Sequence, residues 1–197
     1  MQELKLTSPI PESVNHYLGW RCVYNPKTKR YMAMSYETSD TKAYKKKFSE
    51  YVKQQVKLQG WNLPIDKTQH FYVDCITYFP RIDMDNNNYW KLILDTITET
   101  KTIWEDDNVV CERCMGIRYD TKNPRIELKI YPTDYIGIFD NRAQLEEFES
   151  NCIQCNRYKD GKCSILIKSK EGRIQENIVN NTCKNFKEKD VDEKVYL

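Results

Sequence analysis

The spacing of apolar side chains along the chain predicts its helices. In the clearest pattern an apolar side chain returns at every fourth position, at Tyr44, Phe48, Val52 and Val56. We expect this helix to begin at Ser39 or Asp40, which are both favourable N-caps, and to end near Gln59. Its opposite side carries lysines, as expected for a helix that covers a core with one face only.

A second helix is predicted over 89–98, with Asn87 or Asn88 as its N-cap. Its apolar side chains fall on one face: Trp90, Ile93, Leu94 and Ile97. A short amphipathic helix is expected over 140–149, before a tail that contains four cysteines.

Strands are predicted where aromatic and β-branched residues gather between turn residues. The run 71–79 ends at Pro80, and the runs 109–119 and 125–131 flank a turn. A short strand over 30–34 follows a probable turn, and we expect it at a loop-bearing edge of a sheet. These elements predict an α/β fold, with helices packed on a mixed sheet.

Composition limits the number of domains. The chain has 197 residues, of which 40% are hydrophobic and 30% charged, so it is long enough for one domain and a small appendage. We expect the α/β domain over 1–135 and a Cys-rich, metal-binding module over 136–197. No run reaches the roughly 18 apolar residues of a membrane helix, and no secretion signal is present. A cytoplasmic protein without membrane association is therefore expected.

Positive charge is concentrated in one region. Between Arg21 and Gln59 there are ten Lys or Arg residues and three acidic ones, although the net charge of the chain is only +2. Such a basic face suits contacts with phosphates, and the alternative is a solvated helix surface. The candidate DNA-binding residues are Lys29, Arg30, Lys45, Lys46 and Lys47.

Carboxylates occur in two predicted loops. Residues 81–88 lie between a strand and a helix, and Asp106 and Asp107 precede the next strand. If the two loops met at the ends of the sheet, their oxygens would suit Mg²⁺, which hydrolysis of a phosphodiester requires. An Asp-x-Asp segment alone is weak evidence for a metal site, because aspartates are common in turns. Lys91 and Asp95 strengthen the pattern, although they also form an ordinary helix pair.

These residues together resemble a known family. The run 85–95, followed by Trp-Glu-Asp-Asp at 104–107, is similar to the signature of the RusA-type Holliday-junction resolvases of phages and prophages. The segment 11–17 resembles the N-terminal Pro-Ser-x-Asn-x-x-Tyr segment of that family. The resemblance spans roughly residues 11 to 131, and the joint spacing is more specific than any single piece.

The resemblance implies a magnesium-dependent endodeoxyribonuclease that resolves four-way DNA junctions. It further implies a homodimer that acts on branched DNA in a bacterial or phage-infected cell. Asp85 and Asp107 would bind the metal with the support of Asp106, and Lys91 would be the catalytic lysine. Together Asp85, Asp106 and Asp107 would hold Mg²⁺.

The chain departs from the family pattern Asp-x-Asp-Asn-x-x-Lys. Counted back from Lys91 without a gap, the first aspartate is Asp85 and the second position holds Asn87. Alternatively, residues 83–86 match directly and two extra residues precede Lys91. We favour the ungapped count, with Asp83, Asn87 and Asp95 as supporting residues. Asn87 leaves a second hypothesis open, that of a DNA-binding module without catalysis.

The tail cysteines suggest a metal site. Cys152, Cys155, Cys163 and Cys183 follow the spacing Cys-x₂-Cys-x₇-Cys-x₁₉-Cys, and four-cysteine zinc sites commonly contain such a close first pair. A structural Zn²⁺ is the first interpretation, an iron–sulfur cluster the second and free thiols the third. The other cysteines are expected to be small buried side chains: Cys22, Cys75, Cys111 and Cys114.

Overall fold

The computed structural model describes residues 2–189, which form two compact units. The first unit comprises the chain up to Asp66 together with Phe71–Pro132. The second comprises Lys67–His70 and the chain from Thr133 onward. The expected boundary at residue 135 stays a prediction, because contacts within a chain do not measure independent folding. Within the described residues, no helix combines the length and apolar character that a bilayer crossing requires.

The first unit is built on a mixed sheet with the strand order β1-β6-β4-β5. These strands are β1 (Leu4–Pro9), β4 (Phe71–Phe79), β5 (Val110–Tyr119) and β6 (Arg125–Pro132). Strand β6 runs antiparallel to both of its neighbours, whereas β4 and β5 are parallel. Two parallel neighbours need a crossover between them, and a helix provides it here. The predicted mixed sheet with packed helices is confirmed.

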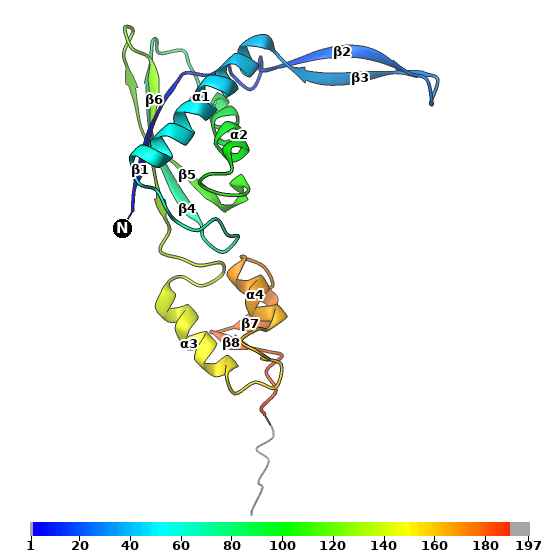
Figure 1. The fold of residues 1–197 in the computed structure, drawn as a ribbon, viewed down its shortest axis with the longest axis vertical. Helices are drawn as coiled ribbons and strands as arrows, with labels where there is room; N and C mark the ends of the chain where they lie inside the picture. Colours follow the sequence, from blue (N-terminus) through cyan, green and yellow to red (C-terminus); the bar gives the residue numbers. More distant parts are fainter. Residues whose placement is uncertain (1, 190–197) are drawn as a thin grey trace, which may run out of the picture. The chain divides into compact units, whose positions relative to one another are not determined.

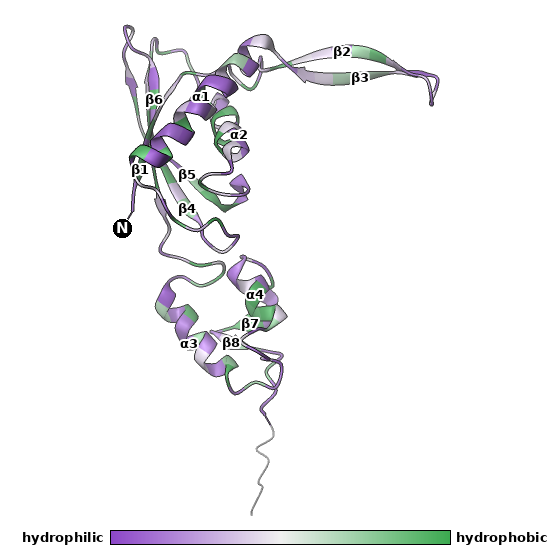
Figure 2. Cartoon of the chain, viewed as in Figure 1, coloured by the Kyte–Doolittle hydropathy of each residue, from purple (hydrophilic) through white to green (hydrophobic). Residues whose placement is uncertain are grey.

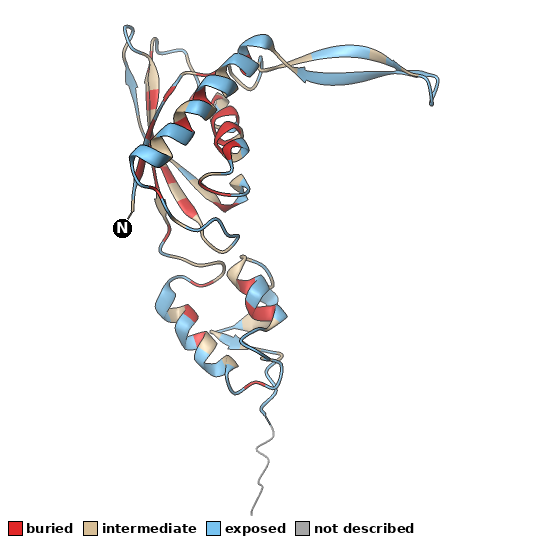
Figure 3. Ribbon diagram, viewed as in Figure 1, coloured by how far each residue is buried: buried red, intermediate tan, exposed pale blue. Residues whose placement is uncertain are grey.

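Helices α1 (Ser39–Leu58) and α2 (Trp90–Thr100) cover one face of this sheet (Figure 1). Every second residue of β4 is buried beneath them, from Phe71 to Phe79. The buried side chains therefore lie between the sheet and the helices (Figure 3), and the outward side of α1 is largely hydrophilic (Figure 2). Large side chains such as Trp104 and Ile97 complete this core.

The helix starts differ slightly from the prediction. Thr38, rather than Ser39 or Asp40, caps α1, and its hydroxyl accepts a hydrogen bond from the Thr41 N–H at 3.2 Å. Helix α2 begins after Tyr89, which makes no side-chain cap. Asn87 and Asn88, the expected N-caps of α2, belong instead to a separate 3₁₀ turn, η1 (Asn86–Asn88).

Strands β2 (Leu18–Asn25) and β3 (Arg30–Glu37) form a hairpin of their own. The strand expected over 30–34 extends to Glu37 and lies beside the hairpin turn, at the edge of a two-stranded sheet. Its hydrogen-bonding partner is β2, which sequence reasoning did not recognise. The hairpin exposes large side chains, including Trp20 at 70% and Tyr31 at 75% of their surface, and it projects from the rest of its unit (Figure 1).

The second unit is small and has little core. Its helices are α3 (Arg142–Cys152) and α4 (Ser164–Lys170), and its strands are β7 (Ile178–Val179) and β8 (Thr182–Cys183). Helix α3 starts two residues later than the predicted 140–149 and extends to Cys152. The buried cluster of this unit consists of Phe139, Leu145, Phe148 and Leu166.

Candidate active site

The loop after β4 is shaped by hydrogen bonds that anchor it to the core. Thr77 in β4 donates its hydroxyl proton to Oδ1 of Asn86 at 2.5 Å, and both side chains are buried. Asp85 caps the following turn, because its Oδ1 accepts a hydrogen bond from the Asn87 N–H at 3.0 Å. Asn86 therefore points inward, while Asp85 and Asn87 remain exposed.

The same loop borders a hollow of about 450 Å³. Asp83, Asp85 and Asn87 line it together with Cys114 and Ile117 of β5. Asp83 forms an ion pair with Arg81 at 2.9 Å, and both side chains are largely exposed. The hollow thus combines carboxylates with solvent access, as an acidic binding site needs.

Lys91 lies in the first turn of α2 and pairs with Asp95. Its Nζ is 3.1 Å from Oδ1 of Asp95, and its side chain stays 59% exposed. This hydrogen bond raises the pKa of Lys91 against the opposing effect of burial. Electrostatic interactions with Asp95, Tyr17 and Asp107 raise the pKa of Lys91 further. The contact of Lys91 with Asp95 is therefore the direct one at this position.

The second acidic loop leads from α2 into β5. Asp106 caps a 3₁₀ turn, η2 (Asp107–Val109), by accepting the Asn108 N–H at 3.0 Å. Buried Trp104 anchors the loop, since its indole N–H donates to the hydroxyl of Thr98 at 2.7 Å. Asp106 is exposed and Asp107 is half-buried.

The two acidic loops join opposite ends of two neighbouring strands, and their expected meeting at the ends of the sheet stays a prediction. Strands β4 and β5 are parallel, with Phe71 opposite Val110 and Phe79 opposite Tyr119. One loop therefore follows the end of β4, whereas the other precedes the start of β5. Among residues 2–189, no three His, Cys, Asp or Glu side chains form a group spaced as metal ligands. The Mg²⁺ set of Asp85, Asp106 and Asp107 stays a prediction.

The N-terminal segment 11–17 lies against the first acidic loop. The Val14 N–H donates to the carbonyl of Asn88 at 2.8 Å. Glu12 accepts hydrogen bonds from the hydroxyls of Thr38 and Thr41, which ties the segment to the start of α1. Sequence reasoning noticed this segment only through the family resemblance, and its contact with Asn88 explains its place beside the site.

The predicted basic residues have different surroundings. Lys45 is only 14% exposed and pairs with both Glu37 and Glu99. Burial opposes its charge, but hydrogen bonds to these two carboxylates raise the pKa of Lys45 overall. Lys46 and Lys47 are exposed on α1, and Lys29 and Arg30 are exposed at the hairpin turn. Lys45 therefore has a structural role. Its contact with DNA stays a prediction, and these ion pairs argue against it.

The eight cysteines are all free thiols. Cys75 is buried as expected, but Cys22 and Cys114 are exposed because their strands lie in the hairpin and at the sheet edge. In the second unit, burial raises the pKa of Cys152 to about 11, and the nearby thiols of Cys163, Cys183 and Cys155 contribute.

The first unit thus presents exposed carboxylates at Asp83 and Asp85, a Lys91–Asp95 ion pair, and exposed basic side chains. Carboxylates of this kind suit a hard cation, and basic side chains suit a phosphodiester backbone. The family model of endodeoxyribonuclease RusA matches residues 22–131, more than half of the chain, so the chain belongs to this family. The predicted family is confirmed. Membership implies an endodeoxyribonuclease that acts on Holliday junctions. A search of curated proteins found no match.

The buried hydrogen bond between Thr77 and Asn86 should be necessary for the loop. Thr77→Val keeps the shape of the side chain but leaves the buried Asn86 oxygen without a donor. We expect the free energy of unfolding to fall by about 1–3 kcal/mol, measured by urea denaturation. The matched control is Thr28→Val in the exposed hairpin turn. Equal stability of the two variants would contradict the role of this hydrogen bond.

Proposed function

We propose that the chain cleaves four-way DNA junctions by magnesium-dependent hydrolysis of phosphodiester bonds, in recombination, repair or phage DNA processing. The family match over residues 22–131 carries the proposal, because it includes both acidic loops and Lys91. The acidic hollow and the exposed lysines are the surface features that support it.

Asp85, Asp106 and Asp107 are the proposed ligands of Mg²⁺. Hard cations prefer such carboxylate oxygens. Asp85 and Asp106 each use Oδ1 to accept a backbone N–H, which orients the carboxylate and leaves Oδ2 available. When bound, the ion would neutralise charge on the phosphate and lower the pKa of a water molecule.

Lys91 has the proposed role of stabilising negative charge that develops on the phosphate. Its partner Asp95 accepts a hydrogen bond from the ammonium group at 3.1 Å and raises the pKa of Lys91. Asp95 is thus a positioning residue, and Tyr17 and Asp107 lie close enough to influence the same group.

The separate turn η1 changes which alignment with the family motif is favoured. The ungapped count avoided an insertion at a helix start, but α2 begins only at Trp90. Two extra residues would therefore fall in η1, outside the helix. The direct match of 83–86 also places the motif asparagine at Asn86, which is buried and hydrogen-bonded. We accordingly propose Asp83 and Asp85 as the two aspartates of the motif, with Asn87 beside them.

DNA contacts are proposed for the exposed basic residues of α1 and the hairpin. Lys46 and Lys47 lie on α1, and Lys29 and Arg30 lie at the hairpin turn. Between Leu18 and Tyr36 the hairpin contains four basic residues and no acidic one, so its charge complements DNA. A homodimer would supply two active sites for the two opposed strands of a junction.

A DNA-binding module without catalysis is the second candidate. It is favoured by the ungapped alignment with the family motif, in which the neutral Asn87 stands where the family has an aspartate. It would bind a junction through the same basic surface and leave it intact.

Asp107→Asn should separate the two candidates. The substitution keeps size but removes a proposed metal-binding charge, so cleavage of a synthetic junction with Mg²⁺ should fall at least about a hundredfold. Junction binding, measured by gel shift, should be unchanged. The exposed Asp134→Asn is the matched control. An unaltered cleavage rate in Asp107→Asn would rule out the metal assignment, and absence of cleavage by the wild type would favour the binding module.

Asp95→Asn should act on Lys91. Because the Asp95 carboxylate raises the pKa of Lys91, its neutralisation should lower that pKa toward the ordinary value. Lys91 then loses its proton at a lower pH than in the wild type. An NMR titration of the Lys91 side chain measures the shift directly, and junction cleavage should decline as well. Glu99→Gln, which removes a partner of Lys45, should leave the Lys91 titration unchanged.

Neighbouring lysines on α1 should differ in their effects. Replacing both Lys46 and Lys47 by Gln should weaken binding to junction and duplex alike, and should reduce the salt dependence of log K by about 0.9 for each lost phosphate contact. Lys45→Gln should instead lower stability, because it leaves Glu37 and Glu99 without their shared partner. Unchanged affinity and salt dependence in the double variant would exclude these phosphate contacts.

A further inference from the structure

The second unit buries too little apolar surface to explain a defined fold by packing alone. Its buried cluster contains four side chains, and the apolar residues packed around them are only partly buried. Small units of this kind usually need a disulfide or a metal as an additional constraint. Its four cysteines are free thiols, and cysteine thiolates are ligands of structural metal sites.

The first two thiols are placed by the end of α3. The Cys155 N–H donates to the carbonyl of Cys152 at 2.9 Å, so a tight turn separates the two residues. Cys155 is buried, and its Sγ accepts the N–H of Lys187 at 3.4 Å. A backbone N–H directed at sulfur stabilises negative charge on that sulfur, as a thiolate ligand requires.

Two tight turns return the chain to this point. Lys159 and Lys162 exchange backbone hydrogen bonds of 3.0 and 2.8 Å around two residues with positive φ, and Cys163 follows directly at the start of α4. Asn180 and Asn181 also have positive φ and join β7 to β8, where Cys183 pairs with Ile178. In both turns the two central residues have positive φ, as in the two-residue turns of β-hairpins, which reverse the chain over the shortest distance.

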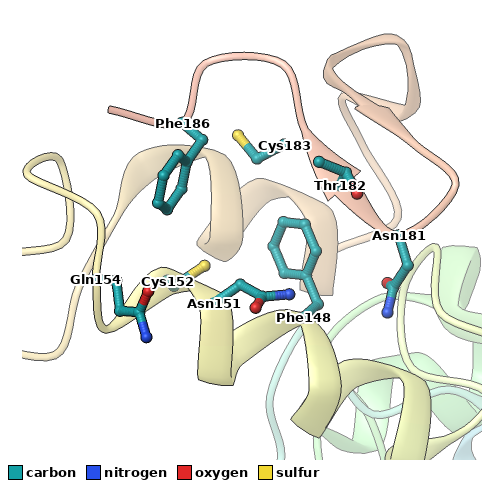
Figure 4. A pocket seen from close by; sticks show the side chains of 8 residues that line it. All are labelled: Phe148, Asn151, Cys152, Gln154, Asn181, Thr182, Cys183 and Phe186. Atoms are coloured by element: carbon teal, nitrogen blue, oxygen red, sulfur yellow. The ribbon is translucent and has the colours of Figure 1, made fainter. Parts of the chain in front are cut away.

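The four thiols gather in one part of the unit. Cys152 and Cys183 line the same cavity of about 300 Å³ (Figure 4). Cys152, Cys163 and Cys183 pack against the same buried cluster, and Cys155, Cys163 and Cys183 are all near enough to Cys152 to act on it electrostatically. Their spacing within the described chain is not yet that of a ligand group, so a metal would have to draw the thiols together.

The charge around the thiols complements a metal with four thiolates. Such a zinc centre has a net charge of about −2, since four negative sulfurs surround one dication. Residues 152–189 contain nine Lys or Arg residues and four Asp or Glu residues. This positive excess complements the negative charge of such a centre.

We propose that Cys152, Cys155, Cys163 and Cys183 bind one zinc ion as thiolates and that this ion stabilises the second unit. Binding releases the thiol protons to solvent and involves no change of oxidation state. The close Cys-x₂-Cys pair and the total of four cysteines suit a closed tetrahedral site. The proposal is independent of junction cleavage, because none of its residues belongs to the acidic loops.

The metal content of the full chain tests this proposal. Protein purified without added metal should contain one zinc ion per chain, and Cys152→Ser and Cys183→Ser should each lose it. Cys22→Ser, an exposed cysteine of the hairpin, is the matched control and should retain it. Chelation should lower the melting temperature of the wild type and of Cys22→Ser, but not that of Cys152→Ser.

A cobalt titration covers the case in which a serine variant fails to fold. The metal-free chain is used with Asp107→Asn, which removes a proposed metal ligand of the first unit. It should bind Co²⁺ with the intense absorption of cobalt–thiolate bonds, and one equivalent of Co²⁺ should saturate this absorption. Junction cleavage plays no part in this measurement, so the outcome is separate from that of the proposed function. The proposal fails if no thiolate band develops, if iron and sulfide are found instead, or if the four cysteines are paired as disulfides.

Discussion

The parallel pairing of β4 with β5 is the constraint on which the rest of the first unit depends. Parallel neighbours cannot be joined by a tight turn, so the chain must cross over the sheet between Phe79 and Val110. Helix α2 makes this crossing and buries its apolar side against the sheet. Both acidic loops follow from the crossing, because one leads into α2 and the other leads out of it.

The alternation of side chains along β4 also controls the first acidic loop. Thr77 occupies a position on the buried face, where its hydroxyl needs a partner within the protein. Asn86 supplies that partner and is thereby held inward. Its neighbours Asp85 and Asn87 consequently face solvent. A single polar residue in a core strand thus determines which loop side chains are available to a ligand.

The elements that could be predicted from sequence are those with one buried face. Strand β4 was found with its observed bounds, because an aromatic and β-branched run ends at Pro80, and α1 was found from its repeat of four. Strand β1 was missed because its buried face offers only Leu4, Leu6 and Ser8. The hairpin could not be assigned because both of its faces are largely exposed, so no apolar and polar alternation marks it.

The sequence indicated which residues belong to the candidate site, but it did not indicate which partners surround each side chain. The acidic residues and Lys91 stood out through their spacing, whereas the partners of each side chain depend on the fold. Lys45, Lys46 and Lys47 illustrate the limit. Successive residues of a helix point about 100° apart, so three adjacent lysines that look alike in sequence face different neighbours. Only Lys45 lies between Glu37 and Glu99, which come from distant parts of the chain.

The two units differ in what can hold them together. The first buries large side chains such as Trp104, Phe71 and Phe79 between two layers, and this burial alone contributes several kilocalories per mole. The second has a smaller cluster and several tight turns, and the proposed zinc ion would add a further constraint. No strand of the four-stranded sheet and neither acidic loop belongs to the second unit. A change in the cysteines should therefore disturb one unit while the residues proposed for cleavage keep their supports in the other.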